Sequence, residues 1–174
     1  MKKYILPLPL LFILLLFGCG NEQTKVNEED VIIDAEQFSN ITSSELISIL
    51  GEPQSVEPYE WKVPSTNQSI VGDLYTYEEG KYEFILFDDN VVRLSINSGS
   101  YWGYDESTFG FIDNESILQL FGISDTYDDM RKTEDNGLMQ RYERVSEGVS
   151  RVEIYEIQND TFGFARITYN ESYY

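Results

Sequence analysis

An eleven-residue pattern that occurs twice is the feature that most constrains the fold of this chain. Residues 41–51 read ITSSELISILG, and residues 112–122 read IDNESILQLFG, 71 residues later. Each copy starts near a residue that can cap a helix N-terminus, Thr42 or Asp113, and ends on a glycine, which often terminates a helix. Apolar residues recur between these ends at helical spacing. The pattern therefore predicts two short amphipathic helices in a duplicated chain.

Strand-like segments follow each predicted helix, separated by turn-forming residues such as the pair Asp89-Asn90 and the pair Asn159-Asp160. The segments are residues 73–77, 82–87 and 91–96 after the first copy, and residues 138–145, 152–157 and 162–169 after the second. We therefore expect an α+β fold with two tandem copies of a short helix, each packed on an antiparallel meander of three to four strands, preceded by a signal peptide.

The N-terminus is typical of an exported lipoprotein. Lys2 and Lys3 precede an apolar run that ends at Cys19, and the run is shorter than the roughly 20 residues that a transmembrane helix needs. We expect residues 1–18 to be a cleaved lipoprotein signal peptide and Cys19 to carry the lipid. The alternative is a plain secretory signal with an incidental cysteine. The predicted location is the cell membrane, lipid-anchored on the extracytoplasmic face.

The rest of the chain divides by composition. Residues 19–35 are mostly polar and suit a flexible tether. Residues 36–98 are expected to form the first α+β repeat. Residues 99–174 are expected to form an aromatic joint, which contains Trp102, followed by the second repeat.

Charge and composition exclude several functions. The chain has a formal net charge of −19, no histidine and one cysteine. It cannot form an intramolecular disulfide, and it lacks the residues of the Ser-His-Asp and Cys-His catalytic arrangements. The acidity disfavours binding to nucleic acid and to anionic membrane surfaces, and it attracts basic partners. We therefore expect a non-enzymatic protein without a cofactor, attached to the membrane through Cys19.

The acidic residues themselves do not predict a metal site. Asp125, Asp128 and Asp129 could gather around calcium, but their spacing fits no loop in which alternate residues turn inward. An ordinary solvated acidic loop is the favoured interpretation.

A family resemblance rests on the first copy. Its helix, the Leu-Gly-Glu-Pro sequence at residues 50–53 and the following meander with YEFILFDDNVVRL at residues 82–94 resemble the BamE/SmpA-OmlA-like domain, which also occurs in tandem in the beta-lactamase inhibitor protein. The resemblance covers residues 42–169 and departs from the pattern after the second helix, where Gly122 is followed by Ile-Ser. It implies a lipoprotein or secreted binding module that works through surface contact, and it supplies no catalytic residue.

The expected partner-binding surface follows from the hairpin at Asp89-Asn90. If these two residues form the loop, Phe87 pairs with Val92 and Ile85 with Leu94, and this set faces the helix. Alternation sends an apolar stripe and one cation to the other face, where we expect partial exposure and partner contact; its members are Tyr82, Phe84, Leu86 and Arg93. Trp102 of the aromatic joint is the fifth expected partner-binding residue. The alternatives are that the second copy or the aromatic joint buries this stripe, or that the joint, with Trp102, binds carbohydrate or a cell-wall ligand.

Overall fold

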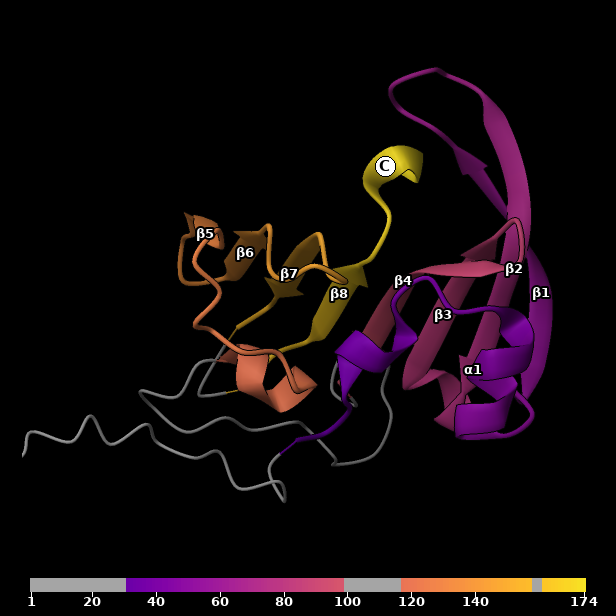
Figure 1. Ribbon diagram of the computed structural model, residues 1–174, viewed down its shortest axis with the longest axis horizontal. Helices are drawn as coiled ribbons and strands as arrows, with labels where there is room; N and C mark the ends of the chain where they lie inside the picture. Colours follow the sequence, from indigo (N-terminus) through magenta and orange to yellow (C-terminus); the bar gives the residue numbers. More distant parts are fainter. Residues whose placement is uncertain (1–30, 99–116, 158–160) are drawn as a thin grey trace, which may run out of the picture.

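The described residues form one antiparallel sheet of eight strands (Figure 1). The computed structural model describes residues 31–98, 117–157 and 161–174. The strand order is β1-β2-β3-β4-β8-β7-β6-β5, so β4 and β8 join two meanders at the centre of the sheet. The strands are β1 (Ser55–Lys62), β2 (Ser69–Tyr77), β3 (Tyr82–Phe87), β4 (Asn90–Asn97), β5 (Arg131–Asp135), β6 (Met139–Glu143), β7 (Arg151–Tyr155) and β8 (Phe164–Thr168).

The part of the chain that the structure describes has one α-helix beside the sheet, which corrects the predicted fold class. The α-helix is α1 (Ser43–Leu50), whereas the second copy of the pattern forms only the short 3-10 helix η4 (Ile117–Phe121). Four of the five residues of η4 are buried, so it has no polar face of the kind that an amphipathic surface helix presents. The prediction of two helix-on-meander repeats is therefore wrong. The domain boundaries at residues 36–98 and 99–174 stay a prediction.

The first helix has the predicted ends. The Thr42 side chain accepts from the Glu45 backbone N–H, and the Glu45 carboxylate accepts from the Thr42 N–H, which completes a capping box. Gly51 has φ 82° and Gly122 has φ 68°, so both glycines have the positive φ that favours glycine at the end of a helix. Gly51 has ψ −173°, which lies outside the left-handed helical region in a conformation that is nearly exclusive to glycine.

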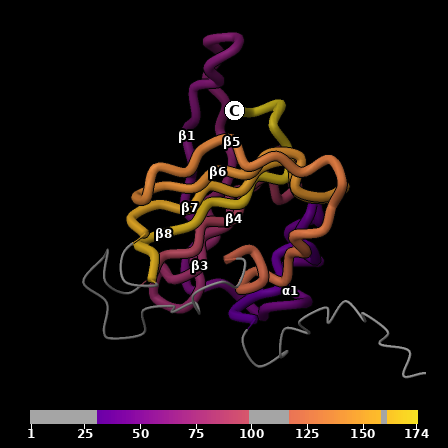
Figure 2. The backbone as a smooth tube through the Cα atoms, turned by 90° about the vertical axis from the view of Figure 1, so that its left-hand side faces the viewer, coloured from indigo at the N-terminus to yellow at the C-terminus, as the bar shows by residue number. Residues whose placement is uncertain are grey.

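Three of the described helices, the 3-10 helix η2 (Ala35–Phe38), α1 and η4, lie on one face of the sheet. They contribute Phe38, Leu46 and Phe121 to a core that also takes residues from both meanders. Figure 2 shows β5, β6, β7, β8 and β4 stacked in that order, with α1 to one side. The shared core explains why the two meanders form one unit. Within the described ranges, no helix is long and apolar enough to cross a bilayer.

Three tyrosines fasten the segment before β1 to the sheet. The hydroxyls of Tyr77, Tyr82 and Tyr169 donate to the carbonyl oxygens of Gly51, Ile32 and Ala35 at 3.2, 3.3 and 2.8 Å. Burial raises the pKa of Tyr77 and of Tyr82 to about 12, and it raises the pKa of Tyr169 well above 10. All three are therefore harder to ionise in the folded protein than in the unfolded chain.

This arrangement predicts loss of stability at high pH. Because the pKa is higher in the folded state, the contribution is complete below the unfolded value of about 10 and is lost as the pH rises toward 12. Urea denaturation at a series of pH values should show a steady fall across this window. Tyr77→Phe and Tyr82→Phe should each make the fall shallower, and an unchanged slope in both would contradict the assignment.

Candidate functional site

The sheet face opposite η2, α1 and η4 is the candidate site, and we call it the helix-free face, since only the short 3-10 helix at residues 171–173 packs on it among the described helices. Cross-strand pairing across the centre of the sheet aligns Ser95, Arg166, Glu153 and Arg141 in one row. A second row aligns Arg93, Thr168, Arg151 and Glu143. Residues directly opposite each other in a sheet point to the same side. Four of the six arginines of the chain therefore share this face, together with several carboxylates.

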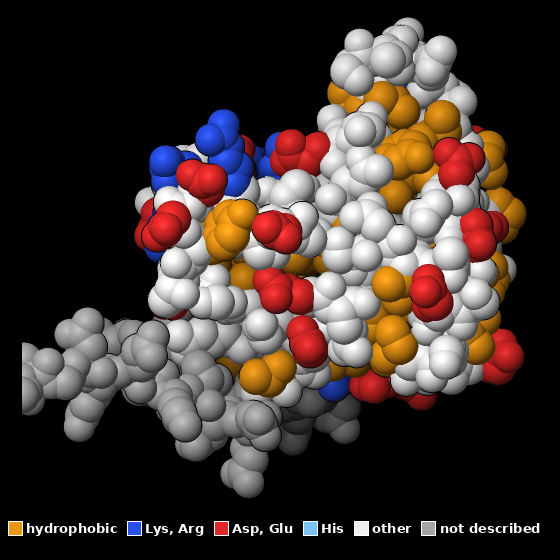
Figure 3. Space-filling model, viewed as in Figure 1, with side chains coloured by type: hydrophobic (Ala, Val, Ile, Leu, Met, Phe, Trp, Pro, Cys, Tyr) orange, Lys and Arg blue, Asp and Glu red, His pale blue; other side chains and the backbone are white. Residues whose placement is uncertain are grey.

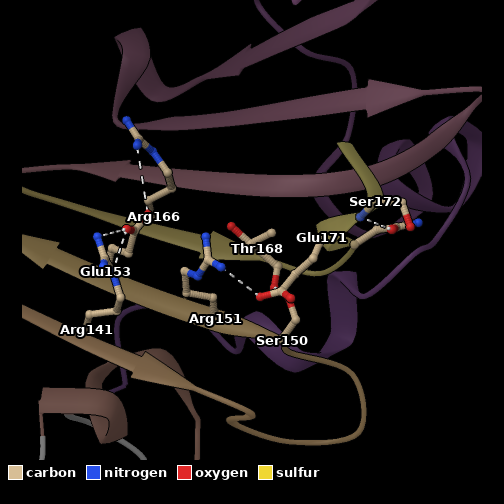
Figure 4. A network of polar contacts seen from close by, with 9 residues as sticks. Arg141, Ser150, Arg151, Glu153, Arg166, Thr168, Glu171 and Ser172 are labelled. Atoms are coloured by element: carbon tan, nitrogen blue, oxygen red, sulfur yellow. Dashed lines mark hydrogen bonds and ion pairs between the residues drawn. The ribbon is translucent and has the colours of Figure 1, made fainter. Parts of the chain in front are cut away.

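Glu153 is the centre of the charged network (Figure 4). It is only 7% exposed, and its Oε1 accepts from Arg141 Nε and lies 3.0 Å from Arg141 Nη2. Its Oε2 lies 3.9 Å from Arg166 Nη1. Desolvation lowers the pKa of Arg141, but the Glu153 carboxylate outweighs it, so the pKa lies above its usual range. The arrangement places the Arg141 and Arg166 guanidinium groups beside one shared, buried carboxylate.

A stacked aromatic pair borders this network. The rings of Tyr155 and Phe164 lie 4.4 Å apart at 13°, and the Arg166 guanidinium lies 5.7 Å from both ring centres. The pair forms one wall of a hollow of about 610 Å³ that is completed by Asn136, Leu138, Met139 and Glu156. Leu138 is 61% exposed, so the hollow opens to solvent beside an apolar side chain.

The β1–β4 end of the same face carries a second aromatic group, which we call the aromatic platform: Tyr59, Trp61, Phe87 and Arg93. Tyr59 and Trp61 stack at 6.2 Å, and the Arg93 guanidinium lies 5.5 Å from the Trp61 ring and donates from Nη2 to Tyr59 Oη at 2.9 Å. In Figure 3, Lys and Arg side chains gather over β5 and β6, and hydrophobic side chains gather near the β1–β2 hairpin. The helix-free face thus has a charged end and an aromatic end.

Three of the predicted binding residues are buried on the other side of the sheet. Tyr82, Phe84 and Leu86 are 7%, 0% and 2% exposed and belong to the core under the helices, so the expected partial exposure is wrong. The reason is that both faces of β3 are apolar, and the helices cover the face with Phe84 rather than the face with Ile85 and Phe87.

The remaining predicted residues are Arg93 and Trp102, expected to bind a partner, and Cys19, expected to carry the lipid. Arg93 lies on the helix-free face, but it is only 6% exposed because aromatic rings cover it. Cys19 and Trp102 lie outside the described residues, so lipidation and the role of the joint stay predictions. The described residues include no group of three or more His, Cys, Asp or Glu side chains placed to hold a metal ion.

The sequence reasoning missed the network around Glu153. Its signal is a period-two alternation of charged and apolar residues, Arg-Val-Glu-Ile-Tyr at residues 151–155 and Phe-Ala-Arg-Ile-Thr at residues 164–168. This alternation is typical of strands with one solvent-facing side, and it shows which residues share that side.

Comparison with known proteins gives little further information. No family model matches the chain, and no curated protein matches it. A crystal structure of an extracellular protein containing a SCP domain from Bacillus anthracis str. Ames is similar over 88% of this chain, with 12% sequence identity and a TM-score of 0.44. This chain spans 50% of the length of that protein. A similarity at this level supports no statement about function, and it does not bear on the resemblance to BamE-like repeats.

Proposed function

We propose that this chain is a lipid-anchored, extracytoplasmic binding protein that engages another protein at the bacterial cell envelope through its helix-free face. The supporting observation is that Arg141, Arg151 and Arg166 share this face with two aromatic groups, and that η2, α1 and η4 all pack on the opposite face. Arginine, tyrosine and tryptophan are the residue types most enriched at the energetic centres of protein interfaces. The proposed role is that of an inhibitor, an immunity factor or an assembly factor, without catalysis.

Charge suggests how a partner is selected. The whole chain carries −19, which favours encounter with a basic protein. Within the face, arginines and glutamates alternate at fixed positions, and a partner must present acidic and basic groups in the complementary order. Such complementarity contributes more to specificity than to raw affinity. A basic protein with a mixed-charge binding surface is therefore the partner that we propose.

Replacing Arg166 tests the proposed face. Arg166→Gln should weaken capture of a partner from an envelope extract by about tenfold or more, because interfacial arginines often contribute more than 1.4 kcal/mol. Glu153 keeps Arg141, so the melting temperature should change little. Arg144→Ala is the matched control, since Arg144 is exposed and lies in the loop after β6. Equal loss of capture in both variants, or in neither, would contradict a role for the face.

Lipidation is tested at Cys19. Growth with a radiolabelled fatty acid should label the protein, and Cys19→Ser should abolish the label and release the protein from the membrane fraction or leave it uncleaved. A wild-type protein that takes up no label would refute the anchor without affecting the proposed binding face.

The second candidate function is carbohydrate binding, and the observation that favours it is the hollow beside Tyr155 and Phe164. Stacked rings next to Asn136 and Glu156 offer an apolar surface and polar groups, which sugar rings require. Soluble cell-wall glycans added to the capture experiment separate the two functions. Glycans should compete only if the hollow binds sugar, and Tyr155→Ala should then abolish the competition.

A further inference from the structure

Arg93 is a buried cation whose hydrogen-bonding capacity is only partly used. It is 6% exposed, and among the described residues it donates to one acceptor, Tyr59 Oη. Its Nε is buried without a partner among the described residues, and so is the hydroxyl of Tyr174, whose ring centre lies 4.5 Å from the guanidinium. Within the described ranges, Arg93 makes no direct ion pair, and the Glu83 carboxylate interacts with it electrostatically only from beyond ion-pair distance. A buried arginine normally has a carboxylate or several acceptors, so these contacts leave the site incompletely satisfied.

The aromatic platform is occupied by residues 171–174, which we call the strap. The Tyr173 ring stacks on Phe87 at 4.8 Å, and the Tyr174 ring lies 5.3 Å from Trp61. Trp61 Nε1 donates to the Tyr173 carbonyl oxygen, and the Tyr173 hydroxyl donates to Asp88 at 3.2 Å. Two adjacent rings and one main-chain carbonyl are thus recognised together, as a bound peptide would be.

The strap is held more weakly than the strands beneath it. The 3-10 helix η5 (Glu171–Tyr173) has no buried residue, whereas Ile167 in the adjoining strand β8 is fully buried. Its other attachment is the ion pair between Arg151 and Glu171 at 3.1 Å, in which Glu171 is 47% exposed. Exposed ion pairs contribute little to stability. Segments with few buried contacts open below the free energy of global unfolding.

We propose that the aromatic platform is a binding site for an extended segment of the partner protein that presents two adjacent aromatic residues and an acceptor oxygen for Arg93, and that the strap is its intramolecular competitor. This inference rests on the proposed protein-binding function and specifies the chemistry of the segment that is bound. The partner segment replaces the two tyrosine rings, accepts from Trp61 Nε1 through its main chain, and supplies the acceptor that Tyr174 does not. Opening of the strap then controls access to the site.

A peptide-binding experiment on the full chain tests the proposal. The strap is released by Tyr173→Ser with Tyr174→Ser, and Trp102→Phe leaves Trp61 as the one tryptophan reporter. The probe is the blocked peptide Asn-Glu-Ser-Tyr-Tyr, with both ends uncharged. It should change the Trp61 fluorescence of the released variant saturably, with an apparent Kd at least about tenfold lower than in the Trp102→Phe parent, where the tethered strap competes at an effective concentration on the order of millimolar.

Two further substitutions, each made in the variant with Tyr173→Ser, Tyr174→Ser and Trp102→Phe (the released variant), test whether the peptide binds at the aromatic platform. Arg93→Gln should weaken peptide binding about tenfold or more, because the shorter amide cannot lie between the rings as the guanidinium does. Leu138→Ala, at the other end of the helix-free face, should leave it unchanged. A folded released variant that does not respond to the peptide overturns the proposal, and so does a released variant that fails to fold.

Hydrogen exchange in the unaltered protein gives an independent test. The Tyr174 backbone N–H donates to Glu171 at 3.0 Å, and the Trp61 indole N–H donates to the strap. Both should exchange at least about 100-fold faster than the amides of β3 and β4. Equal protection would overturn the strap as a separable unit. Partner capture that depends on Arg166, with a negative peptide result, would leave the proposed function intact and reject only this site.

Discussion

Phe84→Ala should lower the free energy of unfolding by about 3 to 5 kcal/mol, the cost of removing a large side chain from a packed core. Phe84 is fully buried, and its ring makes edge contacts with Phe38 at 5.0 Å and with Tyr77 at 5.7 Å. The cavity would lie between β3 and η2, where backbone on both sides limits collapse. The measurement is urea denaturation at neutral pH, where the midpoint should fall without a change in m-value.

Val71→Ala is the matched control for this prediction. Val71 lies on the neighbouring strand β2 and is 66% exposed, so its truncation should change stability by less than about 0.5 kcal/mol. If Phe84→Ala were as mild as Val71→Ala, Phe84 would have to be exposed, and the assignment of the two sheet faces would be wrong.

The faces of β3 illustrate what a sequence can and cannot predict. Alternation correctly separated Tyr82, Phe84 and Leu86 from Ile85 and Phe87. It could not show which set the helix covers, because both sets are apolar. The covering elements η2 and η4 come from distant parts of the chain, and their placement depends on the pairing of β4 with β8.

An earlier turn and a β-bulge together explain the error in the opposite strand. The loop residues are Asp88 and Asp89, both with positive φ, instead of the expected Asp89 and Asn90, so Phe87 pairs with Asn90. The expected pairs were Phe87 with Val92 and Ile85 with Leu94, but Ile85 pairs with Arg93 and Leu86 pairs with Val91. Val92 is the extra residue in β4, so it joins Phe87 on the helix-free side while Leu94 joins the main core. A bulge breaks strict alternation, and hydrophobic spacing alone does not reveal where it lies.

The candidate site was less predictable than the strands. Alternating charged and apolar residues in the sequence identify the strands that carry the network around Glu153. Which residues of different strands lie side by side, as Arg166 and Glu153 do, depends on the register between β7 and β8. The aromatic platform depends on contacts between residues that are still farther apart in the sequence, because Trp61 and Tyr173 are separated by 112 positions. Sequence patterns identify the side of a strand, and the long-range pairing that assembles a site depends on the whole sheet.

Gly72→Ala should cost about 3 kcal/mol, the upper end of the usual range for overpacking. Gly72 lies within β2 opposite Tyr59, and an added Cβ would collide with the Leu86 carbonyl oxygen and come within 2.5 Å of Phe87 Cδ1. A main-chain oxygen cannot move aside without breaking strand pairing. Replacing glycine with alanine in a strand ordinarily stabilises the folded protein by about 0.5 to 1 kcal/mol. The predicted net loss of stability therefore requires that the collision cost more than this stabilisation.

The physical origin of this cost can be tested against Gly137→Ala. Gly137 has φ +80° and nothing within 4 Å of an added Cβ, so alanine there meets backbone strain without collision. Alanine at Gly72 meets a steric collision without that backbone strain. The side chain that it would displace is the Phe87 ring, on which Tyr173 stacks. Gly72→Ala should therefore also change the near-ultraviolet circular dichroism and the Trp61 fluorescence, while Gly137→Ala should not. A loss of stability at Gly72 with unchanged aromatic spectra would mean that the backbone yields instead of the ring, and that the aromatic platform is independent of β2.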